Sequence, residues 1–198
     1  NLLRRTFIDI PHIPKEGIPT RSKKRKIHID LTQKFVARIF NNNSFQEGGR
    51  YFGGFWQRLS SKWRKRIRIN DHKVVEIDYS GIHIIMLYAL KGIDYWSDIK
   101  TDPYNIKGLE QSERMRDLLK VVLLSSINAE NRAKTKQAIQ HEINMDKDLY
   151  RWSLSKKLDL NDILDKFVST HAPIKEYFFS GKGIELQNAD SRIAEMVV

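Results

Sequence analysis

Cysteine is absent from this chain, and long hydrophobic runs are absent as well. Without cysteine there can be no disulfide bond and no thiolate metal site, which suits a reducing compartment. No stretch approaches the roughly 18 apolar residues of a membrane-spanning helix, and no signal-peptide pattern is present. The six histidines do not follow a zinc-ligand spacing such as His-Glu-x-x-His. We therefore expect no membrane partner, a cytoplasmic location and no zinc centre.

Acidic residues are scarce in the first part of the chain. Residues 1–75 contain 18 Lys and Arg but 5 Asp and Glu, a net charge of +13, whereas residues 76–198 contain 17 and 19, a net charge of −2. This asymmetry favours a partner with a phosphate backbone, because Lys and Arg gain affinity there by releasing condensed counterions. A solvated basic face and attraction to anionic lipid are the other interpretations. Charge alone names no function.

The first 70 residues divide into a basic arm and an aromatic, basic segment. The arm contains the run Arg21-Ser22-Lys23-Lys24-Arg25-Lys26, and we expect it to be extended, with a short helix near residues 31–40. Residues 48–70 combine glycines and aromatic residues with seven cations, six of them between positions 58 and 68. Glycines allow close backbone approach, and aromatic residues beside Arg and Lys suit stacking on bases next to phosphates. A hairpin turn with core aromatics is the other interpretation of this segment.

Residues 72–78 alternate in the two-residue period of a strand, and residues 80–90 predict an apolar helix. Val75 and Ile77 would share one face of the strand, and Glu76 and Asp78 the other. Asp78 would then end the strand, where an exposed carboxylate is well placed to hold a metal ion. We further expect one long helix over about 111–139, acidic helices over about 147–179, a turn at 181–183 and a final helix from about Leu186.

Four segments resemble motifs of the family A (DNA polymerase I-type) DNA polymerases. Val74-Val75-Glu76-Ile77-Asp78-Tyr79-Ser80-Gly81-Ile82-His83 resembles their first catalytic motif and the related motif of single-subunit bacteriophage RNA polymerases. Arg116, Lys120, Leu124 and Asn128 recur every four residues, as in the family's fingers helix. Gly49-Arg50 stands where the family carries Thr-Gly-Arg, and Leu186-Gln187-Asn188-Ala189-Asp190 resembles its Gln-containing palm helix. The matches cover about residues 46–198 in the family's order.

The resemblance implies template-directed nucleotidyl transfer in a bacterial or phage-like cell. Asp78 and the Tyr79 carbonyl would bind Mg²⁺, one of two ions in a complete site. Arg116 and Lys120 would hold a nucleoside triphosphate, with Lys120 also the proton donor to pyrophosphate, and Leu124, Asn128 and His83 would lie beside the nucleotide. A DNA primer–template, or RNA, would be held by a set of basic and polar side chains: Arg50, Arg58, Arg64, Arg66, Arg68 and Gln187.

The implied fold is α+β, with a small antiparallel palm-like sheet, Asp78 at its active edge, and a mostly helical fingers-like lobe. Four segments are expected along the chain. They are a basic arm and short helix over 1–45, a palm with the first catalytic motif over 46–95, a helical fingers-like insertion over 96–180, and a palm helix over 181–198.

The chain departs from the family at several positions. Leu124 stands where the family has an aromatic residue, Asn128-Ala129 where it has Tyr-Gly, and His83 where the DNA polymerases have a Glu that blocks a ribose hydroxyl. No His-Asp pair follows Gln187, so the second metal-binding carboxylate is missing, and we expect the sequence to be cut at both ends. A non-catalytic nucleic-acid-binding module derived from this fold, and a metal-dependent nuclease using Asp78 with Glu76, are the alternatives.

Overall fold

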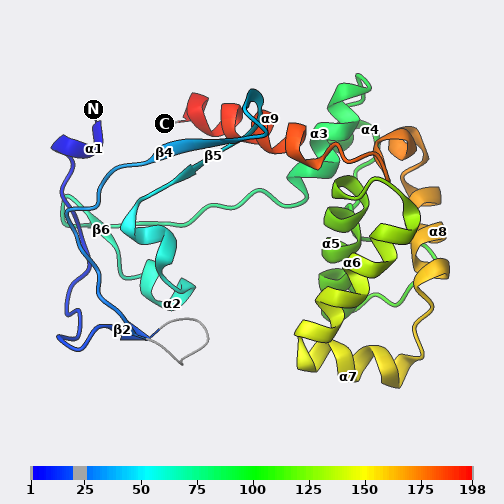
Figure 1. Ribbon diagram of the computed structural model, residues 1–198, viewed down its shortest axis with the longest axis horizontal. Helices are drawn as coiled ribbons and strands as arrows, with labels where there is room; N and C mark the ends of the chain where they lie inside the picture. Colours follow the sequence, from blue (N-terminus) through cyan, green and yellow to red (C-terminus); the bar gives the residue numbers. More distant parts are fainter. Residues whose placement is uncertain (1, 20–25, 198) are drawn as a thin grey trace. The chain divides into compact units, whose positions relative to one another are not determined.

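Short strands and tight turns make up the first part of the chain, and helices make up the rest (Figure 1). The computed structural model describes residues 2–19 and 26–197, so most of the basic run at 21–26 lies outside the described residues. Contacts divide the chain into two units, Asn1–Tyr79 (unit 1) and Ser80–Val198 (unit 2). The α+β class is confirmed, while the palm-like arrangement and the four expected segments stay predictions.

Unit 1 contains three small antiparallel pairings. One sheet has the order β1-β6-β7, and two further pairs are β2-β3 and β4-β5. Their bounds are β1 (Ile8–Asp9), β2 (Ile18–Pro19), β3 (Lys26–Ile27), β4 (Ala37–Asn41), β5 (Ser44–Phe52), β6 (Arg68–Ile69) and β7 (His72–Lys73). The helical pieces of this unit are α1 (Leu2–Arg5), the 3₁₀ turn η1 (Phe55–Arg58) and α2 (Ser61–Arg64).

The β4–β5 hairpin replaces the short helix expected near residues 31–40, so that prediction is wrong. The chain turns at Asn42 and Asn43, whose φ angles are 50° and 54°. Asn tolerates this left-handed conformation better than most residues, so the asparagine run closes a tight turn. Phe40 and Phe45 then meet edge to face across the turn, 5.0 Å apart. Strand pairing with β5 therefore determines the structure of residues 37–41, and the local helix preference of these residues does not.

The predicted strand over residues 72–78 is wrong beyond Lys73. β7 pairs with β6, and its last register pair is Arg68 with Lys73. β6 begins at Arg68, directly after the turn that follows α2, so the ladder has no partner strand for the residues after Lys73 among those described. Val75 and Ile77 are accordingly 84% and 82% exposed. Asp78 thus lies on an extended segment and not at a sheet edge.

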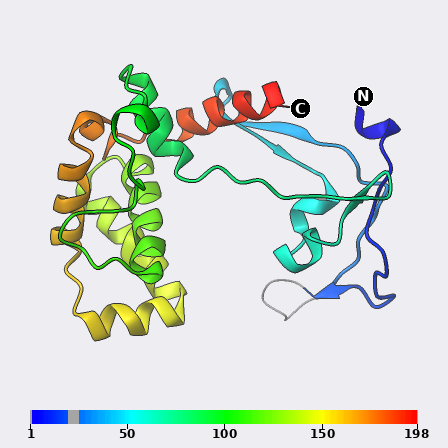
Figure 2. The same ribbon diagram turned by 180° about the vertical axis from the view of Figure 1, so that it is seen from behind.

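Unit 2 is helical, and five of its helices, α4 to α8, begin at a residue whose side chain accepts a hydrogen bond from the first turn. Figures 1 and 2 show α5 and α6 side by side, with α7 across one end of the pair. The elements are α3 (Ile82–Leu90), α4 (Tyr95–Asp98), α5 (Glu113–Asn128), α6 (Arg132–Met145), α7 (Lys147–Lys156), α8 (Leu160–Thr170), the 3₁₀ turn η2 (Ala172–Tyr177) and α9 (Gly183–Val197). The helical region expected over 147–179 is confirmed, but its expected acidity is wrong, since it contains 6 Lys and Arg against 5 Asp and Glu.

The single long helix expected over 111–139 is two helices, α5 and α6. The chain leaves helical geometry at Ala129, and the Asn131 side chain accepts a hydrogen bond from the Lys134 N–H (2.9 Å) to begin α6. The Ala129 carbonyl accepts from the Gly181 N–H (3.1 Å). An N-cap and a tertiary backbone bond therefore stabilise the break. The final helix begins at Gly183, three residues before the expected Leu186.

The core of unit 2 is built on α5. Its buried residues include Met115, Leu118 and Val122, which recur at the spacing of one helix face. They pack with residues of α3, α6 and α8, among them Leu87, Ile139 and Phe167. The opposite face of α5 is left for polar contacts. In the part of the chain that the structure describes, no helix has the length and apolarity needed to cross a membrane.

A buried histidine lies in this core, at the end of α8. Its Nε2–H donates to the Pro103 carbonyl (2.9 Å), so its Nδ1 accepts from the Tyr88 hydroxyl (3.2 Å). Burial lowers the pKa of His171 from its ordinary value of 6.5, and the bond to Pro103 opposes that change only in part. Burial also raises the pKa of Tyr88 to about 12. Both groups are therefore neutral in the folded protein at neutral pH.

Acidification should destabilise unit 2 through His171. The lowered pKa means that the stabilisation is present above pH 6.5 and is lost as the pH falls through the folded-state value. We expect the urea midpoint to fall between about pH 7.5 and about pH 5.5, and to fall less in His171→Gln. His141, which is exposed on α6, provides the control, because His141→Gln should keep the full pH dependence. An equal dependence in all three proteins would contradict this role.

Candidate functional site

Arg116, in the first turns of α5, joins three segments of unit 2. Its Nη2 donates to the Ser80 hydroxyl (3.1 Å), and its Nε donates to the Asp102 carboxylate (3.2 Å). The guanidinium lies over the Tyr104 ring, 4.9 Å from its centre. The side chain remains 34% exposed. Arg116 is therefore held in a defined direction while part of its hydrogen-bonding fork still faces solvent.

The turn that carries Ser80 depends on Gly81. Gly81 has a φ of 66°, and a Cβ at this position would lie 2.9 Å from Pro103 Cγ. A larger residue would therefore strain the backbone and push the turn away from the loop at residues 102–104. Gly81 therefore meets a structural requirement of this turn. It keeps Ser80 within reach of the Arg116 guanidinium.

A pocket of about 300 Å³ opens on one side of Arg116. Asp102, Glu110 and Glu113 are among its lining residues, together with Tyr104. Burial raises the pKa of Tyr104, although the positive charge of Arg116 opposes this change. The three carboxylates would repel a triphosphate, so an anion would approach Arg116 from another side. The sequence did not predict that Asp102 and Tyr104 position Arg116.

The row predicted on the fingers-like helix lies on the solvent-facing side of α5. Lys120 follows Arg116 by one turn, and its ammonium forms an exposed pair with Asp117 (2.7 Å). Leu124 is 44% exposed, and Asn128 is also exposed. The Asn128 amide donates to the Leu124 carbonyl (2.7 Å), and its side chain lies against Gly183, where a Cβ would be 2.1 Å from the Asn128 oxygen. Asn128 therefore fits the start of α9 against the end of α5.

The other predicted residues of unit 2 lie on two helices that pack together. His83 is half-buried in the first turn of α3, and Gln187 is half-buried on α9. α9 contacts both α3 and α5. The structure thus brings the helices that carry His83, Gln187 and the Arg116 row into one packed group.

Asp78 and Tyr79 end unit 1, on the exposed segment after β7. A groove of about 620 Å³ is lined by residues 74–78 together with Arg64 and Lys65. Glu76, the partner expected for Asp78 in a nuclease, forms an ion pair with Arg64 (2.7 Å). Among the described residues no group of three or more His, Cys, Asp or Glu is arranged to hold a metal ion. These residues therefore do not complete the two-ion Mg²⁺ site that the resemblance implies.

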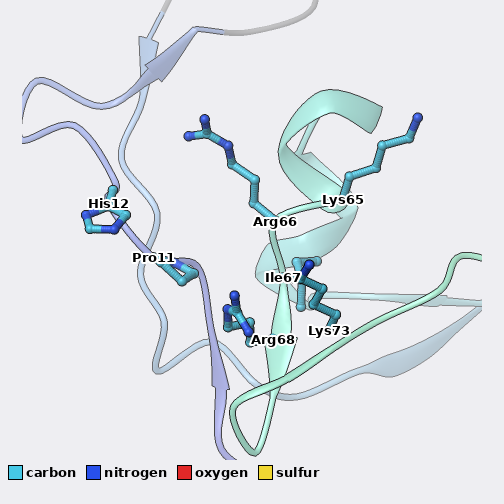
Figure 3. Close-up of a pocket in the computed structure, with 7 residues that line it drawn as sticks. All are labelled: Pro11, His12, Lys65, Arg66, Ile67, Arg68 and Lys73. Carbon is cyan, nitrogen blue, oxygen red and sulfur yellow. The ribbon is translucent and has the colours of Figure 1, made fainter.

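The predicted nucleic-acid-binding arginines of unit 1 have different surroundings. Arg50 on β5 and Arg58 at the end of η1 are exposed. Arg64 forms an ion pair with Glu76 and donates a hydrogen bond to the Leu59 carbonyl (3.0 Å). Arg66 and Arg68, by contrast, line one pocket together with three further side chains that carry or can acquire positive charge, which are His12, Lys65 and Lys73 (Figure 3). Sequence reasoning missed His12 and Lys73, because strand pairing is what brings them to this pocket.

The two units differ in charge as well as in structure. Residues 1–79 contain 18 Lys and Arg against 7 Asp and Glu, and residues 80–198 contain 17 of each. The whole net charge of +11 therefore lies in unit 1. Comparison with protein families, curated proteins and solved structures found no match to the chain.

Proposed function

We propose that this chain is the nucleotide-binding and template-binding part of a template-directed nucleotidyltransferase of the family A polymerase type. The observation that carries the proposal is the hydrogen bond between Arg116 and Ser80. It joins the cation row of α5 to the tripeptide Asp78-Tyr79-Ser80. The two motifs were selected separately from the sequence, and a direct bond between them is what a common site requires.

Covalent geometry supports the same proposal for Asp78. Two peptide links separate Asp78 from Ser80, and consecutive Cα atoms are about 3.8 Å apart. The two Cα atoms are therefore at most about 7.6 Å apart, whatever the arrangement of the units. Ser80 accepts a hydrogen bond from Arg116, so chain connectivity is compatible with an Asp78 carboxylate that acts on a phosphate held by Arg116.

Arg116 and Lys120 suit a triphosphate because their present partners can be exchanged. Both pair with carboxylates that are substantially exposed, those of Asp102 and Asp117. Exposed ion pairs contribute little stability, whereas Arg and Lys form stronger, charge-assisted hydrogen bonds with phosphate oxygens. Arg116 would orient the phosphates through its planar fork, and Lys120 would bind as a point charge and donate a proton to the leaving pyrophosphate.

Mg²⁺ would supply the remaining electrostatic stabilisation in such a reaction, by activating a hydroxyl and neutralising the leaving group. Asp78 and the Tyr79 carbonyl are the ligands that the resemblance implies. A two-ion site needs further carboxylates, which the described residues do not gather around Asp78. The proposal for this chain therefore concerns phosphate binding, and it assigns Asp78 a role that depends on a second carboxylate.

A non-catalytic nucleic-acid-binding module is the second candidate. It is favoured by the concentration of net positive charge in unit 1 and by the use of Asn128 to fit α9 against α5. In family A polymerases the matching position carries a Tyr, so the structural role of Asn128 points away from contact with a nascent base pair. Binding of nucleoside triphosphate distinguishes the candidates, because this module needs only a nucleic-acid strand.

Removing either cation of the α5 row should weaken nucleoside triphosphate binding. A charge-assisted hydrogen bond contributes about 1.5–3 kcal/mol, so Arg116→Ala and Lys120→Ala should each raise the Kd at least about tenfold in isothermal titration calorimetry. Lys134→Ala is the matched control, because Lys134 is likewise a helical lysine paired with an acid of the same segment, Glu130. Equal affinities in the three variants would refute triphosphate binding by this row.

Asp78→Ala should abolish template-directed primer extension by the complete protein and leave duplex binding nearly intact. The carboxylate would act on the reacting groups, whereas duplex affinity comes from cations. Extension is followed with a labelled primer, and binding with the same duplex by fluorescence anisotropy. Asp148→Ala, at an exposed carboxylate on α7, should leave both properties unchanged. Primer extension that persists in Asp78→Ala would overturn the assignment.

A further inference from the structure

A second phosphate site is indicated within unit 1, at a pocket built by the β1-β6-β7 sheet. The pocket has a volume of about 320 Å³ and is lined by seven residues, which are Pro11, His12, Lys65, Arg66, Ile67, Arg68 and Lys73. No carboxylate is among these lining residues. Figure 3 shows that His12 and Arg66 belong to different segments, and that Lys65 extends in a different direction from Arg66.

Strand register is what brings the charges together. Arg68 on β6 lies opposite Asp9 on β1 and opposite Lys73 on β7. Side chains directly opposite across antiparallel strands lie on the same face, so Arg68 and Lys73 are a like-charge pair, which destabilises a sheet. The Asp9 carboxylate accepts a hydrogen bond from the Ile10 N–H (2.6 Å) and forms no ion pair with Arg68.

Among the described residues, the cations of the pocket have no acidic partners. In the described part of the chain, none of Lys65, Arg66, Arg68 and Lys73 forms an ion pair with a carboxylate. Arg66 instead lies over the Trp63 ring (4.7 Å), and Arg68 donates to the Asp71 carbonyl (3.0 Å). These contacts fix the directions of the guanidinium groups without cancelling their charge. An anion bound between them would remove the repulsion.

Phosphate is the anion that these groups fit best. Arg presents a planar fork of donors that matches phosphate oxygens, and Lys adds a point charge. The volume of about 320 Å³ admits one phosphate group and part of an attached sugar. A concave site of this size favours a single phosphate of a strand over a flat anionic membrane surface.

We propose that this pocket binds a phosphate group of a nucleic-acid strand, either a terminal monoester or an internal diester. The proposal rests on the proposed function only in taking nucleic acid as the ligand. Arg66 and Arg68 would contact the phosphate oxygens, Lys73 would add charge from the neighbouring strand, and His12 would lie at the rim. The site is independent of the triphosphate site on α5, since all its residues belong to unit 1.

The test measures binding of two labelled single-stranded oligonucleotides, identical except that one carries a 5′-phosphate, by fluorescence anisotropy at several salt concentrations. The double variant Arg66→Ala/Lys73→Ala should weaken oligonucleotide binding about tenfold or more. It should also reduce the slope of log affinity against log salt concentration by about two. Lys62→Ala is the matched control, because Lys62 is exposed on α2 and does not line the pocket. It should change the affinity far less than the double variant does.

The two oligonucleotides separate the sources of the phosphate. If a terminal phosphate is the ligand, the 5′-phosphorylated strand binds more tightly, and the double variant removes that difference. If an internal diester is the ligand, both strands bind alike and lose affinity alike. Losses no larger than those of Lys62→Ala for both strands would overturn the proposal. So would binding to anionic phospholipid vesicles that is as tight and equally sensitive to the double variant.

Lys73→Glu tests the pocket without relying on a disruptive change. It places a carboxylate opposite Arg68, so the thermal midpoint should rise or stay constant while oligonucleotide binding falls at least tenfold. Nucleoside triphosphate affinity, which depends on α5 in unit 2, should remain unchanged in this variant. If the wild-type protein binds no nucleoside triphosphate but still binds oligonucleotides through the pocket, the α5 proposal alone is refuted. Unchanged oligonucleotide affinity in a folded Lys73→Glu protein would refute the pocket alone.

Discussion

The candidate site of unit 2 depends on the contacts of the Arg116 guanidinium. It connects α5 to Ser80 at the start of the unit and to the loop of Asp102 and Tyr104. Each partner uses a different property of Arg, namely its hydrogen-bonding fork, its charge and its flat face. A Lys at this position could not satisfy all three. The structure therefore gives Arg116 a positioning role before any ligand is considered.

The carboxylates that position Arg116 and Lys120 must be displaced before these cations can bind an anion. The free energy of this displacement is small because the ion pairs are exposed. A triphosphate would compete with Asp102 for Arg116 and with Asp117 for Lys120. Since these pairs face solvent, their contribution is small and the exchange is feasible. The buried face of α5, with Leu118 and Val122 in the core, keeps the helix rigid while the pairs change. A rigid helix with exchangeable surface partners is suited to binding phosphates repeatedly.

The sequence predicted the elements whose signals are local and missed those that depend on a distant partner. Helix α3 and the helical region from Lys147 follow from apolar periodicity and side-chain caps. The break between α5 and α6 was missed because residues 128–131 are compatible with a helix, and the bond from Gly181 to Ala129 lies far away in sequence. The alternation over residues 74–78 predicts a strand, but alternation cannot show that a partner strand exists. Arg116 and Lys120 were found by spacing, whereas Asp102, Tyr104 and Lys73 belong to their sites through tertiary contacts.

Two features of unit 1 break the usual rules of stable sheets, and both lie on the segment that leads to Asp78. The like-charge pair of Arg68 and Lys73 weakens the β6–β7 pairing, and Val75 and Ile77 place apolar side chains in solvent. Stability alone favours neither, since a single acid at position 73 would correct the first. Departures from local consistency concentrate where a protein binds something. Because the pocket ends at Lys73 and the exposed segment begins two residues later at Val75, a phosphate strand bound at the pocket would lie next to the segment that carries Asp78.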